Sequence, residues 1–171
     1  MCVDRFWDDH HEASVDIVSC GDSPWEGVTS YSTVGVSDIP LVKDGNELDI
    51  RTEMVGACGS QFTDFPNYLS TAAFFVINSG WLAAPGVIFP DVLSMYEASD
   101  TMKHFLFLPP FLWDERLRTL DLRGRKVAWL LAIPISQAEL EFAESEGVSA
   151  LEDRFEAHQI DIFDLKRASV V

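Results

Sequence analysis

The chain is poor in basic residues and in cysteine, and it has no long apolar run. Only 12 of its 171 residues are Lys or Arg, against 28 Asp or Glu, so its formal net charge is −16 at pH 7. A surface of this sign repels nucleic acid and anionic membranes, and neither is expected as a direct partner. Apolar runs such as residues 127–134 are too short to cross a bilayer, and the acidic N-terminus lacks the apolar core of a secretion signal.

The three cysteines (Cys2, Cys20 and Cys58) are an odd number without metal-like spacing. They suit a reducing compartment, where cysteine acts as a small apolar residue, so we expect a cytoplasmic protein. The acidic and histidine-rich segment 8–12 (DDHHE) offers ligand-type side chains, but adjacent histidines on an extended segment point to opposite faces. We therefore predict no bound metal and no cofactor.

Several segments have the alternation or the composition of β-strands. The residues are 47% hydrophobic and 12% aromatic, which is enough for a full core. In the segment 48–56, charged side chains at Asp49, Arg51 and Glu53 alternate with apolar ones, as in an antiparallel strand with one wet face. Asp44-Gly45-Asn46 predicts a hairpin turn before it. Strands are predicted at 13–20, 28–36, 48–56, 87–89, 103–108 and 126–133.

Helix signals occur at two places. Asp64 has the position of an N-cap, apolar residues recur at helical spacing after it, and Gly80 ends the pattern. Ser136 and Glu139 form a capping-box pattern that opens an acidic helix, and a further short helix is predicted at 151–158.

The combination of elements predicts an α+β fold in a single domain. We expect a mostly antiparallel mixed sheet with helices packed against it. Residues 1–12 are predicted to be a short polar lead-in and residues 13–171 to form the domain. Trp81, Trp113 and Trp129 are most simply core residues, and an exposed tryptophan among them would indicate an interface hot spot instead.

The segment YSTVGVSDIP at 31–40 raises the question of a catalytic serine. A nucleophile elbow requires Gly-x-Ser-x-Gly on a strand-to-helix turn, but Ile39 replaces the second glycine here and another strand follows. His104 and His158 could serve as bases only if the fold brought them to Ser37. We predict no catalytic residues, and a small serine hydrolase that uses Ser37 remains the least favoured alternative. Ser37 and Asp38 are expected to hydrogen-bond the strand end and the turn.

Acidic residues gather in the segments 4–26 and 139–164. The glutamates of the predicted C-terminal helices spread over more than one face, which argues against a catalytic pair. For any one of them a solvated helix face is the simplest interpretation, whereas the group is interpreted as an acidic surface that binds a protein partner. This acidic set comprises Glu139, Glu141, Glu144, Glu146, Glu152, Asp153 and Glu156.

Four segments carry a combination of motifs in a fixed order. They are STVGVSD at 32–38, FLFLPPF at 105–111, VAWLLAIPISQAEL at 127–140 and DLKRASV at 164–170. Together with the alternating strand through Glu53 and the helix that ends in Gly80, they resemble the Suppressor of Fused-like domain family over roughly residues 13–170.

The resemblance implies an α+β domain that acts by binding protein and has no known catalytic residues. Bacterial members resemble immunity proteins or antitoxins that neutralise toxins, and the animal relative is a regulator that holds a transcription factor in the cytoplasm. The N-terminal helix common in the family is expected to be missing or much shortened here, and the long carboxy-terminal domain of the animal protein is expected to be absent. The resemblance assigns a structural role to Gly35, Ser37, Asp38, Arg167 and Ser169. Arg167 is expected to pair with a carboxylate, for which Asp38 is one candidate.

The leading hypothesis is therefore a non-enzymatic bacterial immunity protein or antitoxin that neutralises a toxin by stoichiometric binding. A basic nuclease is the toxin class that would suit an acidic, nucleic-acid-like surface. A signalling or regulatory adaptor of the Suppressor of Fused type is the alternative. The sequence leaves the oligomeric state open.

Overall fold

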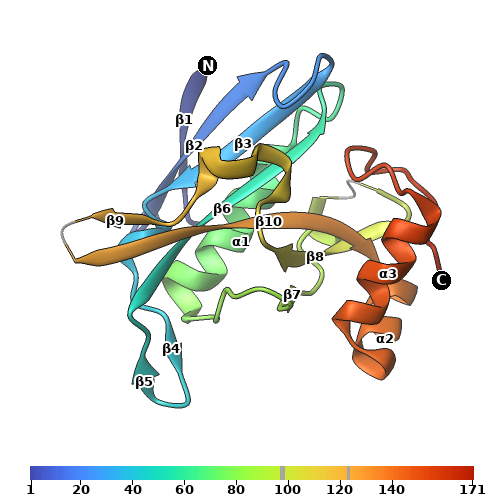
Figure 1. Ribbon diagram of the computed structural model, residues 1–171. Helices are drawn as coiled ribbons and strands as arrows, with labels where there is room; N and C mark the ends of the chain where they lie inside the picture. Colours follow the sequence, from blue (N-terminus) through green and yellow to red (C-terminus); the bar gives the residue numbers. More distant parts are fainter. Residues whose placement is uncertain (97–98, 123) are drawn as a thin grey trace.

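Two long strands, β6 (Ile50–Gly59) and β10 (Arg125–Ser136), run parallel through the middle of one twisted sheet (Figure 1). The computed structural model describes residues 1–96, 99–122 and 124–171. The other strand pairs are antiparallel, in the order β1-β2-β3-β6-β10-β8-β7, with β9 added beside β10. These strands are β1 (Cys2–Trp7), β2 (Ser14–Gly21), β3 (Val28–Val34), β7 (Ile88–Phe89), β8 (Met102–Leu108) and β9 (Leu120–Leu122).

Helices and turns complete the domain. The helices are α1 (Phe65–Ser79), α2 (Gln137–Glu146) and α3 (Val148–His158), and the 3₁₀ turns are η1 (Val36–Asp38), η2 (Ser94–Tyr96) and η3 (Phe111–Leu117). A small hairpin of β4 (Val42–Lys43) and β5 (Asn46–Glu47) projects from the sheet (Figure 1). The predicted α+β class, with its mostly antiparallel mixed sheet in a single domain, is confirmed. No helix of the described residues is long and apolar enough to span a membrane.

The two faces of the central strands build two cores. On β8, Phe105 and Phe107 face the core that α1 covers, whereas Leu106 and Leu108 face a second core that includes η3, α2 and α3. Both faces are therefore buried, as is typical of strands that are apolar throughout, such as residues 127–133 of β10. Helix α1 approaches the sheet closely because Gly56 has no side chain. A Cβ there would lie 2.5 Å from a ring carbon of Phe65.

Two sequence-based predictions about the sheet need correction. The strand 48–56 was expected to have one wet face, but β6 is buried on both sides from Thr52 onward, and Glu53 is 5% exposed. The reason is that both faces of β6 are covered: Met54 and Cys58 lie in the core under α1, whereas Val55 and Ala57 lie in the second core. The lead-in predicted over residues 1–12 also contains β1, which pairs with β2 at the edge of the sheet.

His104 on β8 predicts a pH dependence of stability. Its Nδ1 accepts a hydrogen bond from Asp91 N at 2.8 Å, so the other ring nitrogen carries the proton and donates to Gln137 Oε1 at 3.0 Å. Burial lowers the pKa of His104 below its ordinary value of 6.5, and this outweighs the nearby carboxylate of Asp91. The folded state thus binds this proton less readily than the unfolded state. The contribution of His104 to the free energy of unfolding is expected to be fully present above its ordinary pKa and to be lost as the pH falls from there through the lowered pKa of the folded state.

The test is urea unfolding at several values between pH 7 and pH 5. In His104→Asn the amide oxygen can still accept from Asp91 N, but the group no longer titrates. We expect the variant to lose part of the stability decrease that the parent shows over this range. An unchanged pH dependence in the variant would assign the effect to other groups.

Candidate protein-binding cleft

The segment Ser32–Asp38 folds around the buried carboxylate of Glu53. Thr33 Oγ1 donates to Glu53 Oε2 at 2.6 Å, and the backbone N–H groups of Gly35 and Ser37 each donate to Oε1 at 3.0 Å. Gly35 has φ 119°, a conformation that residues with a side chain rarely adopt. Ser37 therefore contributes its backbone to this turn.

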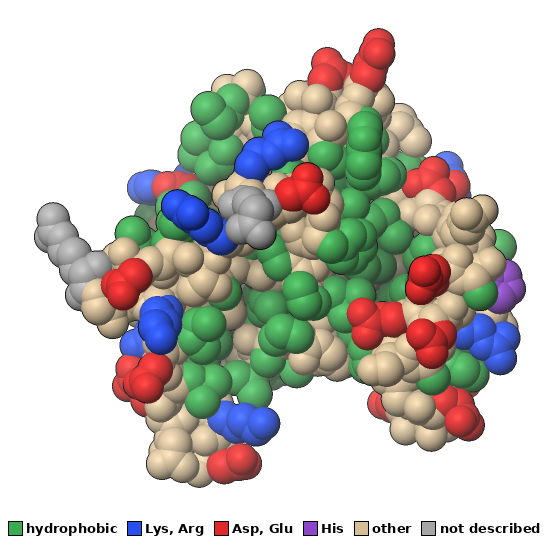
Figure 2. Space-filling view, viewed as in Figure 1, with side chains coloured by type: hydrophobic (Ala, Val, Ile, Leu, Met, Phe, Trp, Pro, Cys, Tyr) green, Lys and Arg blue, Asp and Glu red, His purple; other side chains and the backbone are tan. Residues whose placement is uncertain are grey.

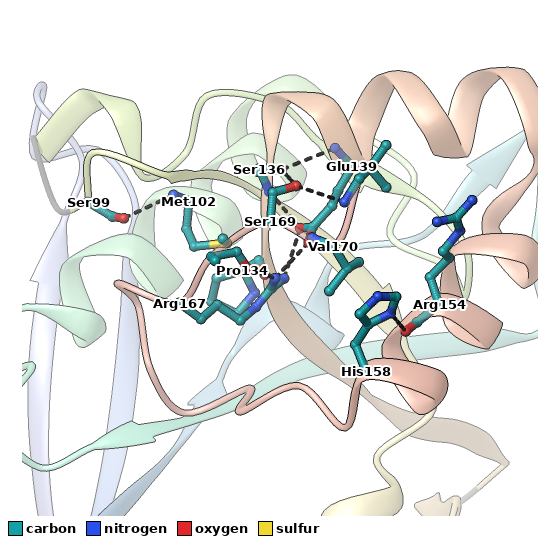
Figure 3. A network of polar contacts seen from close by, with 12 residues as sticks. Ser99, Met102, Pro134, Ser136, Glu139, Arg154, His158, Arg167, Ser169 and Val170 are labelled. Atoms are coloured by element: carbon teal, nitrogen blue, oxygen red, sulfur yellow. Dashed lines mark hydrogen bonds and ion pairs between the residues drawn. The ribbon is translucent and has the colours of Figure 1, made fainter.

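A second buried carboxylate, Glu139, organises the C-terminal segment (Figure 3). Arg167 donates to both of its oxygens, at 2.6 and 2.8 Å, and also to Pro134 O at 3.0 Å. The backbone N–H groups of Ser136 and Val170 donate to the same carboxylate at 2.9 and 3.1 Å. Glu139 is 0% and Arg167 7% exposed. The C-terminal segment is thus tied to the start of α2.

Neighbouring contacts extend this network. Ser136 caps α2 in the predicted capping box, and its hydroxyl lies 2.9 Å from the hydroxyl of Ser169. The Arg167 guanidinium stacks over the ring of Phe155 at 5.3 Å from the centroid, which places an α3 side chain against the C-terminal segment.

Two site predictions are wrong in detail. Arg167 pairs with a carboxylate, but the partner is Glu139, because Asp38 lies elsewhere and accepts from Arg125 at 2.8 Å. Asp38 therefore anchors to β10 rather than capping its own turn. Glu139 cannot belong to an exposed acidic surface, because its carboxylate points inward to Arg167. The other members of the acidic set are exposed: Glu141, Glu144, Glu146, Glu152, Asp153 and Glu156.

The geometry gives the hydrolase alternative no support. Both ring nitrogens of His104 are engaged by Asp91 and Gln137, and His158 Nδ1 bonds Arg154 O at 2.9 Å. Among the described residues, neither histidine is hydrogen-bonded to Ser37. Burial also raises the pKa of Cys58 to about 12, which leaves its thiol unreactive at neutral pH.

A cleft of about 570 Å³ opens between η3 and α3. We call it the η3–α3 cleft. Its floor consists of Leu108, Ile133 and Phe155, which belong to the second core. Trp25 and Phe111 also line it, and they are 54% and 56% exposed. Figure 2 shows hydrophobic side chains across this face, with acidic side chains over the helices beside them.

Hydrogen bonds fix the walls of the η3–α3 cleft. Trp113 on η3 donates from its indole to Ser30 Oγ at 3.1 Å, which attaches that wall to β3. The loop after α3 is held by Gly59, whose N–H donates to Phe163 O at 2.9 Å. The ring of Phe163 in turn meets Trp25 edge-on, with centroids 5.3 Å apart. The apolar opening is therefore largely preformed.

The rim of the η3–α3 cleft is acidic. The charged residues among those that line it are Glu152, Glu156 and Asp161. Glu152 and Glu156 lie four residues apart on α3, so both occupy one face of the helix. The exposed part of the acidic set thus divides into this rim pair and residues on other faces of α2 and α3.

Sequence reasoning missed the aromatic part of this site. No prediction concerned Trp25, and Phe111 was noted only as part of a family motif. Of the tryptophans expected in the core, Trp113 is 7% exposed but Trp81 is 37% exposed. The adjacent prolines before Phe111 were a usable signal, since they end β8 and force its next residues out of the sheet.

A preformed apolar cleft with a charged rim, on an α+β scaffold, is typical of a protein-binding domain. The comparisons agree with this class. The family model of Suppressor of fused protein (SUFU) matches residues 11–168, so the chain belongs to that family. It is also 49% identical over 169 residues to "Immunity protein YqcF" of Bacillus subtilis (strain 168), covering 99% of this chain and 88% of that protein.

Solved structures share the fold. A putative SUFU homologue from Neisseria gonorrhoeae has a TM-score of 0.74 at 18% identity, covering 99% of this chain and 88% of the other. A chain of the Sufu–Fu complex has a TM-score of 0.62 at 13% identity, covering 92% of this chain and 77% of the other. Drosophila Suppressor of Fused has the same score and identity, with 92% and 42% covered.

Proposed function

We propose that this protein is an immunity protein, or antitoxin, that neutralises a cognate toxin by stoichiometric contact and without catalysis. The observation that carries the proposal is the 49% identity to an immunity protein over 99% of the chain. The similarity covers 99% of this chain and 88% of the relative, so it is not confined to one segment. The preformed η3–α3 cleft supports binding as the mode of action.

The charge of the chain favours a basic nuclease as the toxin. A net charge of −16 accelerates association with a basic protein and selects against acidic ones. Exposed carboxylates on α2 and α3 would occupy the positive surface on which a nuclease binds its substrate. We place the encounter in the cytoplasm, where free thiols such as Cys2, Cys20 and Cys58 persist.

The proposal is tested with a candidate toxin from the native host, for which any toxin-like domain encoded beside the gene is the first choice. Co-expression is expected to restore growth that the toxin alone arrests, and the purified pair should form a one-to-one complex. Its association rate constant should fall about tenfold between low and moderate salt, because long-range attraction is screened. Failure to restore growth or to form the complex would contradict the immunity role, and a salt-independent rate would contradict the electrostatic part.

A variant separates binding from the hydrolase alternative. Ser37→Ala keeps the backbone N–H that Glu53 binds. It is therefore expected to protect as well as the parent, whereas a nucleophilic Ser37 would make protection fail.

A regulatory adaptor of the Suppressor of Fused type is the second candidate. The family match over residues 11–168 favours it, together with the fold that the chain shares with a protein of the Sufu–Fu complex. A one-to-one complex with a host protein other than a toxin, together with no protection against the toxin, is the result expected for the adaptor.

A further inference from the structure

The η3–α3 cleft combines exposed aromatic side chains with an acidic rim. We propose that it is the site at which the partner binds, and that it takes a large apolar side chain flanked by lysine or arginine. The inference rests on the proposed function only in naming that partner as the toxin. The chemistry of the bound segment follows from the cleft itself.

The apolar part of the cleft is suited to a bulky side chain. Trp25 and Phe111 are more than half exposed, whereas Leu108, Ile133 and Phe155 below them are buried. Partly exposed aromatic residues beside an apolar depression are typical of interface hot spots, where burial of one anchor excludes water from several rings. A volume of about 570 Å³ exceeds one aromatic side chain, so it also accommodates part of the adjoining backbone.

The charged part selects the residues beside the anchor. Glu152, Glu156 and Asp161 line the opening, and each is exposed. Like charges four residues apart destabilise a helix slightly, so the Glu152–Glu156 arrangement does not serve the stability of α3. A lysine or arginine between them would remove the repulsion and form charge-assisted hydrogen bonds at the edge of an apolar surface.

Charge also decides against other occupants. A second copy of this chain would bring a net charge of −16 to an acidic rim, and nucleic acid would be repelled in the same way. A segment that joins an apolar anchor to basic flanks satisfies both parts of the cleft. The walls are already held by Trp113–Ser30 and Gly59–Phe163 bonds, so little ordering opposes its binding.

The test uses two model peptides and no toxin. The probes are acetyl-Lys-Lys-Phe-Lys-Lys-amide and its acidic counterpart acetyl-Glu-Glu-Phe-Glu-Glu-amide, titrated into the ¹⁵N-labelled full chain. The basic peptide is expected to shift the Trp25 indole signal and amide signals of residues 152–163. The acidic peptide should bind at least tenfold more weakly. Equal binding of both peptides, no binding, or shifts centred elsewhere would overturn the inference.

Matched variants separate the cleft from general acidic attraction. Two double variants each remove two negative charges from the helices. Glu152→Gln/Glu156→Gln removes them at the cleft, whereas Glu144→Gln/Asp153→Asn removes them outside it. We expect the first pair to weaken binding of the basic peptide at least fivefold and the second less than twofold. Equal losses would show attraction without a site and would overturn the inference.

The aromatic wall has its own control. Trp25→Ala should abolish detectable binding of the basic peptide, whereas Trp7→Ala, which removes a similarly exposed indole from β1, should leave it unchanged. Toxin neutralisation then distinguishes the two proposals. If the parent protects and the Glu152→Gln/Glu156→Gln/Trp25→Ala variant protects equally, the cleft inference fails and the immunity role stands. If the parent does not protect but the peptide binds as expected, only the immunity role fails.

Discussion

Replacing Arg167 with alanine is expected to lower the free energy of unfolding by about 3–5 kcal/mol, because it leaves a buried carboxylate without its counter-charge. Glu139 would retain only the backbone donors of Ser136 and Val170. In a domain of this size the loss corresponds to a fall in melting temperature of about 10 °C. Urea unfolding monitored by circular dichroism measures the free energy, and calorimetry measures the melting temperature.

Two comparisons make this prediction specific. Arg125→Ala removes the partner of Asp38, but both side chains are at least half exposed, so a loss of no more than about 1 kcal/mol is expected. Arg167→Met combined with Glu139→Gln should be more stable than Arg167→Ala, because no charge is left buried and the Gln oxygen still accepts from one of the two backbone N–H groups. If Arg167→Ala were no more harmful than Arg125→Ala, the Glu139 network would not hold the C-terminal segment.

The same variant connects the C-terminal motif to the η3–α3 cleft. Arg167 lies over the ring of Phe155, and that ring forms part of the cleft floor. Loss of the guanidinium therefore removes two interactions: the ion pair with Glu139 and the contact with the Phe155 ring in the cleft floor. Arg167, from the C-terminal motif, therefore acts on the cleft from behind, without lining it.

Local patterns were sufficient to predict most elements of the fold. The strand at 103–108, the helix ending at Gly80 and the capping box at Ser136 each depend on neighbouring residues, and each is present. The capping box also predicts the direction of the Glu139 side chain. A glutamate that reaches back to its N-cap points along the helix axis, so it is a poor candidate for an outward surface.

Long-range partners explain what could not be predicted. Glu53 and Glu139 were assigned to wet faces because an isolated carboxylate is costly to bury. Their burial depends on Thr33, 20 residues away, and Arg167, 28 residues away, and no periodicity encodes such pairings. The η3–α3 cleft likewise brings Trp25 and Phe111 to one opening from segments far apart in the chain.

Replacing Glu53 with alanine is expected to lower the free energy of unfolding by about 2–4 kcal/mol, since buried donors would lose their acceptor. Thr33 Oγ1 and the N–H groups of Gly35 and Ser37 all donate to this carboxylate. The turn that follows β3 should also loosen. Urea unfolding gives the free energy, and hydrogen exchange at the Gly35 and Ser37 amides reports the turn directly.

Glu53→Gln should be milder than Glu53→Ala. Its oxygen can still accept from both amides, and its NH₂ can donate to Thr33 Oγ1, whose proton can turn to Met54 O, now 3.3 Å away. Glu47→Ala, at an exposed carboxylate paired with Arg51, provides the surface control and should change stability by less than about 1 kcal/mol. Fast exchange at Gly35 and Ser37 in Glu53→Ala, but not in Glu47→Ala, would assign the protection of the turn to the buried acid. Equal exchange in both variants would mean that the backbone of this segment holds its shape without Glu53.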